Sequence, residues 1–462
     1  MKKSSKSMKG IISSLIIMGM IAPSVTSVFA DDQPSTFNTT YANCNVKMYG
    51  FIESDMISDS QQPSFYEESD TPALPKSNTY AGNNGRVITG IRNSRLGFDI
   101  TMPETDSGLK TEAILEMDFL GNQSANTTPG NAGGTQSERD YFNNPTARIR
   151  HAYLNFTYGN ENAKFGQTWS LLGWQPYYFP SEPEVSPTVG QLYRRFPQVR
   201  FTDSRSLGIL GLSDLKLESA ADVAKPAEMD SDLVDYHAGL RLSYDKIKAA
   251  TGLSSPSGDR MVGLSIASSW IWEPITTVNI GKQTGQGYAL DALIPIIPSK
   301  DGKDMSNNLS LCGEYSHASG IGGLELAGAT AGITAPTAAQ MGNGNPLDSG
   351  IAGINMRGAL DLIQFETARA DLTYVLPCPQ WAVSTGYAQV RPDNLGDFVV
   401  MSTNKSTSFI SNYAYYYGSL FYTPLKWLRF AAEFAEFHDT YVDVKAPNAQ
   451  DNRLQFTTYI SF

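Results

Sequence analysis

Arginines recur in this sequence within or next to short segments in which apolar and polar residues alternate. In a narrow, partly desolvated space, a guanidinium group attracts anions and can bind a carboxylate through two hydrogen bonds. The arginines placed for such a role are Arg95, Arg148, Arg150, Arg194, Arg195, Arg200 and Arg241. The alternative is that they balance the nearby acids Glu112, Glu116 and Asp118 across the same space. The residue types allow both interpretations.

The segment 169–197 combines aromatic residues with charges. Between Gly173 and Pro180 it reads Gly-Trp-Gln-Pro-Tyr-Tyr-Phe-Pro, more aromatic than a solvated loop usually is. We expect the segment to fold inward, pack against an inner wall and form a constriction. A loop folded over the outer rim or packed on a neighbouring subunit is the alternative. The charged residues that it would bring to the constriction are Glu182, Glu184, Arg194 and Arg195.

Residues for catalysis or metal binding are sparse. The only histidines are His151, His237, His317 and His438, and none stands in an H-E-x-x-H pair. The three cysteines, Cys44, Cys312 and Cys378, are too few for a disulfide framework and lack the spacing of metal ligands. A G-x-S-x-G nucleophile motif is also missing. We therefore predict neither enzymatic activity nor a bound metal or cofactor.

Segments that alternate apolar and polar residues indicate β-strands to position these side chains. In 95–101, Leu96, Phe98 and Ile100 share one face, and segments 109–119 and 235–244 alternate in the same way. Outside the first residues, no apolar run is long enough for a membrane helix. The pattern fits both a soluble sandwich, with the apolar face inward, and a transmembrane barrel, with that face outward.

The links between these segments favour the barrel. Short links are expected at 158–161, 244–246, 272–274, 376–379 and 423–426, and long ones at 59–92, 120–146, 284–307 and 392–408. Short and long links largely alternate, as they do when tight periplasmic turns take turns with external loops. We predict an all-β, up-and-down antiparallel barrel of sixteen strands, with eighteen as the alternative. Such a barrel leaves a lumen wide enough for water.

Residues 1–30 predict a secretory signal peptide. Lys2, Lys3, Lys6 and Lys9 precede the apolar run 11–22, and Val28-Phe29-Ala30 has the spacing of a cleavage site. The predicted organisation is a signal peptide 1–30, cleaved after Ala30, a short segment 31–44 and a barrel 45–462. The chain has a net charge of −11, and losing these lysines makes it more acidic. Such acidity argues against nucleic acid as a partner.

The last ten positions form a complete alternating strand that stops at the chain end. Leu454, Phe456, Thr458, Ile460 and Phe462 share one face. This face resembles the carboxyl-terminal signal by which outer-membrane barrels are recognised for assembly. We therefore expect export to the outer membrane of a Gram-negative-type envelope. The expected partners there are membrane lipid and the barrel-assembly machinery, which would recognise Phe456, Ile460 and Phe462.

Five stretches resemble the DcaP-like porins, trimeric outer-membrane channels. They are Met48–Phe51, Ser94–Phe98, Arg148–Tyr153, Phe165–Ser170 and Pro197–Thr202, in the family's order. The resemblance implies a sixteen-stranded homotrimer that admits small anions, dicarboxylates among them, with basic residues at the constriction. Residues 31–41 show no heptads of the amino-terminal coiled coil that some relatives carry.

Two functions follow for a barrel of this kind. The first is a porin, a passive diffusion channel for small hydrophilic solutes that favours anions. The second is a structural or adhesive barrel that displays its long loops without significant transport. They differ in the interior, because a channel needs an open lumen with charged groups around it.

Overall fold

Residues 36–462 form one compact unit. The computed structural model describes residues 38–41, 44–63, 74–121, 145–174, 190, 192, 194–208, 214–224, 234–250, 261–277, 281–321, 332–333, 336–337, 350–398, 409–442, 447 and 449–462. The predicted signal peptide and the two loop acids Glu182 and Glu184 lie outside these residues.

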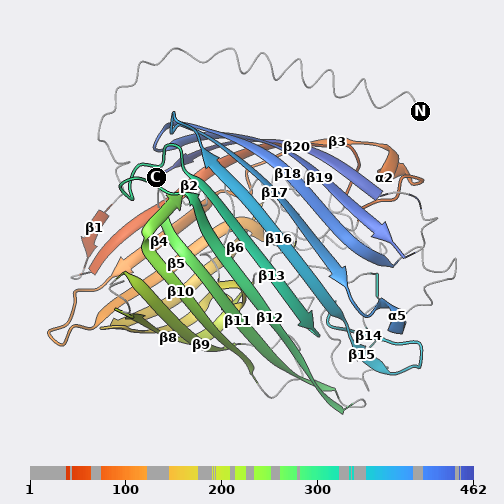
Figure 1. Ribbon diagram of the computed structural model, residues 1–462, viewed down its shortest axis with the longest axis horizontal. Helices are drawn as coiled ribbons and strands as arrows, with labels where there is room; N and C mark the ends of the chain where they lie inside the picture. Colours follow the sequence, from red (N-terminus) through yellow and green to blue (C-terminus); the bar gives the residue numbers. More distant parts are fainter. Residues whose placement is uncertain are drawn as a thin grey trace. The chain divides into compact units, whose positions relative to one another are not determined.

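Sixteen strands close into an antiparallel barrel (Figure 1). Around the ring they are β2 (Cys44–Asp59), β4 (Arg95–Thr101), β5 (Lys110–Gly121), β6 (Thr146–Tyr158), β7 (Glu161–Trp169), β8 (Arg195–Ser206), β9 (Leu215–Ala224), β10 (Asp235–Ala250), β11 (Met261–Thr277), β12 (Gly281–Ile297), β13 (Leu309–Ser319), β16 (Gln364–Val375), β17 (Trp381–Pro392), β18 (Ile410–Leu425), β19 (Leu428–Tyr441) and β20 (Ala449–Ser461). Each strand pairs with the next, and β20 pairs back onto β2. The predicted all-β barrel of sixteen strands is confirmed.

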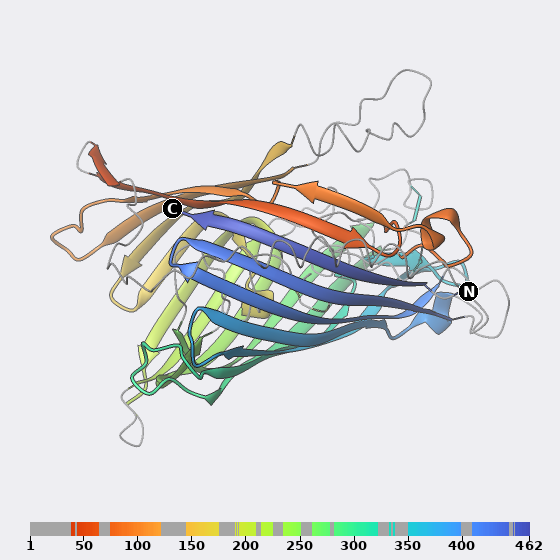
Figure 2. The same ribbon diagram turned by 90° about the horizontal axis from the view of Figure 1, so that it is seen from above.

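Two further strands also pair with β2, namely β1 (Asn38–Tyr41) and β3 (Arg86–Gly90). The helices are short: α2 (Tyr80–Asn83), η1 (Leu172–Trp174) and α5 (Leu395–Phe398). A separate hairpin of β14 (Ala352–Ile354) and β15 (Leu360–Leu362) lies with α5 at the end of the barrel away from the carboxyl terminus (Figures 1 and 2). In the part of the chain that the structure describes, no helix has the length and apolarity needed to cross a membrane.

On much of the barrel, apolar side chains point outward and charged ones inward. On β10, Tyr236 and Leu240 are each 46% exposed, whereas His237 and Arg241 are 2% and 6% exposed. A soluble β-sandwich has the reverse arrangement, with its apolar side chains packed between the sheets. The outward apolar surface is the one that a hydrocarbon environment requires. The structure thus decides the orientation that the alternation left open.

A bulge in β6 explains how Arg148 and Arg150 reach the interior. By simple alternation both would share the outward face of Leu154. The pairing with β5 shifts between Glu116 and Met117, so that Arg150 is the extra residue on β6. Outward-facing positions therefore change from odd to even: Ile149 is 52% and Leu154 48% exposed, while Arg150 is buried.

The short links predicted at 158–161 and 376–379 are confirmed, with gaps between strands at 159–160 and 376–380. The link predicted at 423–426 overlaps the observed gap at 426–427, but residues 423–425 belong to β18. Two are wrong. Residues 244–246 lie inside β10, where the register with β11 shifts between Tyr244 and Lys248, so they form a bulge and not a turn. Residues 272–274 lie inside β11. Pro274 is tolerated there because the pairing with β10 ends at Trp272, so its missing N–H breaks no bond of that ladder.

Among the long links, 120–146 and 392–408 match the gaps between β5 and β6 and between β17 and β18. The link 59–92 contains β3. The link predicted at 284–307 is wrong, because β12 continues from Gly281 to Ile297. This strand is paired on both sides, with β11 and β13, and that pairing outweighs its Gly and Pro content.

Apolar side chains fill part of the interior. Phe365, Tyr415 and Phe437 lie on β16, β18 and β19 and are fully buried. They belong to one cluster with residues of the connecting segments, among them Leu74, Leu192, Ile321, Ile333 and Leu395. Apolar contacts therefore hold parts of several connecting segments inside the barrel.

The last strand joins the barrel through its backbone. The Phe462 N–H donates to the Gly50 carbonyl at 3.0 Å, and the Gly50 N–H donates to the Phe462 carbonyl at 3.1 Å. Ile460 is 47% exposed on the outer face, and Phe456 lies on the same face, half-buried. Recognition of these residues by the assembly machinery stays a prediction.

On the inner face of the same seam, Asp59 of β2 binds two arginines. Arg453 Nε of β20 donates to Asp59 Oδ1 at 2.8 Å, and Arg86 Nε of β3 donates to Asp59 Oδ2 at 3.1 Å. Arg453 is only 1% exposed. This buried ion pair joins the first barrel strand to the last.

Replacing Asp59 by Ala should destabilise the barrel, because it removes the carboxylate that both guanidinium groups bind. The expected loss in the free energy of unfolding is about 3–5 kcal/mol. Urea unfolding of the protein folded in lipid vesicles measures it. The control is Asp106→Ala in the exposed turn between β4 and β5, which should leave the unfolding midpoint unchanged. Equal midpoints for the two variants would contradict the role of the seam ion pair.

Candidate functional site

A buried ion cluster joins β5 and β6 inside the barrel. Arg150 Nε donates to Glu116 Oε1 at 2.9 Å, and its Nη1 donates to Asp118 Oδ2 at 2.8 Å. Arg148 binds both oxygens of Asp118, at 3.0 and 2.6 Å. In this cluster Arg148 and Arg150 are therefore paired with acidic residues, which agrees with the alternative that the arginines balance nearby acids.

Trp169, at the end of β7, links this cluster to further arginines. The guanidinium of Arg150 lies 5.7 Å from its ring centroid, and that of Arg195 lies 4.4 Å away. The Trp169 carbonyl accepts a hydrogen bond from Arg200 Nη2 at 2.6 Å. Two cation–π contacts with the Trp169 ring and this bond to its backbone gather Arg150, Arg195 and Arg200 around one residue.

The other predicted arginines have different contacts. Arg95 is buried at the start of β4, with its guanidinium 5.2 Å from the Phe51 ring centroid. Arg194 is half-buried just before β8, and its carbonyl accepts from the Ser170 N–H at 2.6 Å. Arg241 on β10 forms an ion pair with Glu218 on β9. The predicted arginines therefore line the wall from β4 to β10 and do not meet at one point.

A row of polar side chains crosses five neighbouring strands on the inner face. In the register of the sheet, the row runs Asn155 (β6), Lys164 (β7), Arg200 (β8), Asp222 (β9) and His237 (β10). Cross-strand neighbours on one face lie about 4.5–5.5 Å apart at Cβ. Asp222 joins the last three, because it accepts from Arg200 Nε at 3.0 Å and contacts His237 Nδ1.

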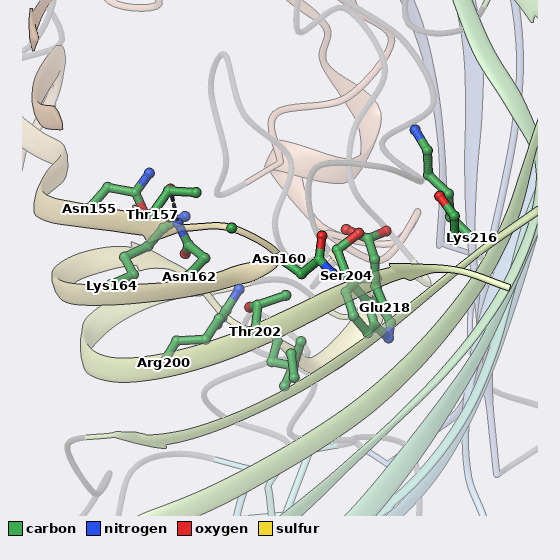
Figure 3. Close-up of a pocket in the computed structure, with 15 residues that line it drawn as sticks. Asn155, Thr157, Asn160, Asn162, Lys164, Arg200, Thr202, Ser204, Lys216 and Glu218 are labelled. Carbon is green, nitrogen blue, oxygen red and sulfur yellow. Dashed lines mark hydrogen bonds between the residues drawn. The ribbon is translucent and has the colours of Figure 1, made fainter. Parts of the chain in front are cut away.

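Asn155, Lys164 and Arg200 of this row line a cavity of about 520 Å³ near the turn between β6 and β7 (Figure 3). We call it the cationic cavity. Lys164 and Arg200 lie side by side on its wall, from directly opposite positions of β7 and β8. The next inward row of the wall is neutral and consists of Thr157, Asn162 and Thr202, which also lie opposite one another.

Lys164 supplies the excess charge of the cationic cavity. Arg200 is paired with Asp222, Glu218 with Arg241, and Lys216 with Asp245 at 2.6 Å. Among the described residues, no carboxylate lies within ion-pair distance of Lys164 Nζ, which sits 4.6 Å from the centroid of the Tyr153 ring. A cation beside a second cation, without a carboxylate of its own, attracts a mobile anion.

The residues after β7 cover the cavity from the lumen side. Leu171 and Trp174 line the cavity and belong to a buried apolar cluster with Ala267 of β11. Trp174 Nε1 donates to the Ser268 carbonyl at 3.0 Å. The indole also packs on the backbone of β10, where a Cβ on Gly239 would lie 2.9 Å from Nε1.

The other described end of the segment 169–197 also contacts inner walls. The Leu192 N–H donates to Glu314 Oε1 of β13 at 2.6 Å. Gly190 lies so close to β17 that a Cβ there would be 3.0 Å from the Ala388 side chain. Its two described ends thus contact strands from β10 to β17. The aromatic centre of the segment, 175–189, lies outside the described residues.

The sequence interpretation missed Lys164, Asn162 and Thr202. A signal was available, because Lys164 and Asn162 alternate with Ala163 and Phe165, which places them on the polar face of a strand. The pairing of Lys164 with Arg200 depends on the register between β7 and β8, which alternation does not specify. Within the described ranges, no three His, Cys, Asp or Glu side chains gather to hold a metal ion.

The closed barrel, its apolar outer face and its charged interior define the fold class of the outer-membrane porins. The crystal structure of the outer membrane channel DcaP of Acinetobacter baumannii is similar, with a TM-score of 0.61 and 18% sequence identity over 92% of this chain and 99% of that chain. An anion-selective porin from Comamonas acidovorans matches with a TM-score of 0.49 and 10% identity, over 91% of this chain and 100% of that chain. No protein-family model and no curated protein matches the sequence.

At 18% identity, the likeness to DcaP shows the fold. The resemblance to DcaP-like porins that the sequence motifs predicted is confirmed at that level.

The tight packing of Trp174 on β10 yields a test. Gly239→Val should displace the indole, because the added Cβ overlaps it. The packing of the residues after β7 on β10 should lose about 1–3 kcal/mol of free energy. Acrylamide quenching of tryptophan fluorescence should increase in the folded barrel. Gly418→Val on β18 is the matched control, since a Cβ there meets nothing within 4 Å. Identical quenching in the two variants would show that the indole does not rest on β10.

Proposed function

We propose that this protein is an outer-membrane porin, a passive diffusion channel for small hydrophilic solutes that favours anions. The observation that carries the proposal is the cationic cavity, where Lys164 lies beside Arg200 and no carboxylate of the described residues lies within ion-pair distance of Lys164. The cavity lies on the inner wall of a closed barrel. An anion that enters the lumen therefore meets a fixed positive charge there.

The segment 169–197 is proposed to narrow the lumen next to this cavity. Its described ends contact β11, β13 and β17, which supports an inward course. Arg194 and Arg195 at its end, and Glu182 and Glu184 in its undescribed part, would set the charges at the constriction. Trp174 would then form part of the narrow passage.

Local charge decides selectivity more than the acidic balance of the whole chain. Charges on outer loops are screened beyond about 8–10 Å at physiological salt. In a water-like medium two unit charges 4 Å apart interact by about 1 kcal/mol, which is about fivefold in local ion concentration. One lysine at the pore wall is enough to favour anions at that scale. The dicarboxylates implied by the resemblance belong to this class of solute.

The proposal includes the route to the membrane and the assembly. The segment 1–30 would be cleaved after Ala30 on export, and the last strand would be read by the barrel-assembly machinery through Phe456, Ile460 and Phe462. Three copies would form a homotrimer, as the resemblance implies. None of these steps needs a cofactor.

One observation favours the display barrel as a second candidate. The buried apolar cluster of Phe365, Tyr415 and Phe437 fills part of the interior together with residues of the connecting segments. An interior filled in this way throughout would display loops without transport. Single-channel recording in planar bilayers separates the two candidates, because a display barrel gives no conductance steps.

Charge reversal at Lys164 tests the anion preference. In a KCl gradient, the unmodified channel should show an anion-selective reversal potential. Lys164→Glu should lower the anion-to-cation permeability ratio by about fivefold or more, because it replaces an attractive charge with a repulsive one. Lys303→Glu, in the exposed turn between β12 and β13, changes the net charge equally and should leave the ratio unchanged. Equal ratios in both variants would remove the cavity from the permeation path.

Truncating Trp174 tests the constriction. Trp174→Ala removes a buried indole from the segment that covers the cavity, so the single-channel conductance should rise. Trp272→Ala on the outer face of β11, where the side chain is 44% exposed, is the matched control and should not change it. A conductance that stays constant in Trp174→Ala would place the passage elsewhere.

A further inference from the structure

We propose that the cationic cavity selects hydroxylated monocarboxylates, the chemical class of sugar acids, over dicarboxylates and neutral sugars. The inference rests on the proposed function and narrows its solute class. It follows from how charge, neutral polar groups and apolar surface are arranged on the wall.

The charge of the cavity matches one carboxylate. Arg200 shares its charge with Asp222, and the ion pairs Glu218–Arg241 and Lys216–Asp245 neutralise the wall toward the turns. Lys164 remains, without a carboxylate partner among the described residues. A second carboxylate on the same solute would meet only cations that already share an ion pair, Lys216 with Asp245 and Arg241 with Glu218.

Neutral hydrogen-bonding groups lie next to this charge. Asn162 Nδ2 donates to Asn155 Oδ1 and to Thr157 Oγ1, both at 2.8 Å, which holds the amide in place. The hydroxyl groups of Thr202 and Ser204 line the cavity and make no hydrogen bond to any described residue. These groups accept and donate hydrogen bonds, and so they suit the hydroxyls of a solute.

The spacing of the rows fits a short polyhydroxylated chain. Lys164 and Asn162 are two residues apart on β7, which is about 7 Å along a strand. A solute whose carboxylate binds at Lys164 and Arg200 therefore places hydroxyls, a few bonds away, beside Asn162 and Thr202. A dicarboxylate of similar length places its second charge at this neutral row, toward Glu218 (Figure 3).

The opposite side of the cavity is apolar. Leu171 and Trp174 present apolar surface from the segment that covers the cavity, and Ala220 adds to it from β9. The C–H groups of a sugar-like chain can lie on this surface while its hydroxyls face the polar rows. The volume of about 520 Å³ lies within the range of ordinary small-ligand sites, about 300–1,000 Å³.

Current interruption by four probe solutes tests the proposal. The full chain, folded and inserted in planar bilayers, is titrated with gluconate, succinate, hexanoate and glucose. Each hydrogen bond to a solute hydroxyl should strengthen binding by about two- to tenfold. With two such bonds, gluconate should reach half-maximal interruption at a roughly tenfold lower concentration than the other three solutes. Hexanoate has the single carboxylate but no hydroxyls, so it tests the contribution of the hydroxyls. Glucose has the hydroxyls but no charge and tests the contribution of the carboxylate, and succinate tests the effect of a second carboxylate.

Two variants assign the effect to the cavity. Thr202→Val keeps the side-chain shape but removes a hydroxyl. It should therefore raise the gluconate concentration for half-maximal interruption several-fold and leave that of succinate unchanged. Lys164→Met should raise the half-maximal concentrations of gluconate, succinate and hexanoate together. Thr440→Val, on the outer face of β19, is the matched control for the first variant and should change none of them.

Each outcome decides a separate point. An anion-selective channel that succinate blocks at equal or lower concentration than gluconate overturns this inference and leaves the proposed function standing. Equal blocking by hexanoate and gluconate, or an unchanged response in Thr202→Val, rejects the role of the hydroxyl row. A protein without conductance, or with cation selectivity, overturns the proposed function and the inference together.

Discussion

Inside a lipid bilayer, a β-strand edge has no water to bind its N–H and C=O groups, and each group left unpaired costs several kcal/mol. This chain satisfies the constraint by closing β20 onto β2. β20 reaches β2 only from Phe51 to Asp59, and the short strand β1 pairs with Cys44–Lys47, beyond the end of β20. The ion pair between Arg453 and Asp59 adds a side-chain link across the same seam.

Closure also decides where charge can lie. Once the ring is complete, every second side chain faces hydrocarbon and the others face the interior, so the charged residues of the strands gather inside. They are close together there, and most form pairs such as Arg150 with Glu116 and Asp118. The bulge at Arg150 lets two arginines on β6 share this interior while Ile149 and Leu154 keep to the outside.

The proposed function depends on the charge that this pairing does not neutralise. Along the row from Asn155 to His237, Asp222 joins Arg200 and His237, and Lys164 has no ion pair with a carboxylate in the part of the chain that the structure describes. The segment that carries Leu171 and Trp174 then covers this charge with apolar surface. A net negative chain can in this way present a positive site to a solute, because selectivity depends on the nearest charges within a screening length.

The strands that alternate cleanly, such as 95–101 and 235–244, could be read from the sequence, as could the closing strand and the total of sixteen. Residue types alone predicted turns and loops wrongly where the pairing between strands overrides their local preference. Asp245 and Lys246 suggested a turn but form a bulge, and the Gly-rich start of β12 suggested a loop but is paired on both sides.

The sequence by itself determined the period of the strands, since side chains alternate in any extended chain. Only the tertiary structure decided which face turns outward and which residues of different strands meet. Lys164 and Arg200 are far apart in the chain, and they become neighbours through the register between β7 and β8. A shift of that register by one residue would turn one of them toward the lipid, and the cationic cavity would not exist.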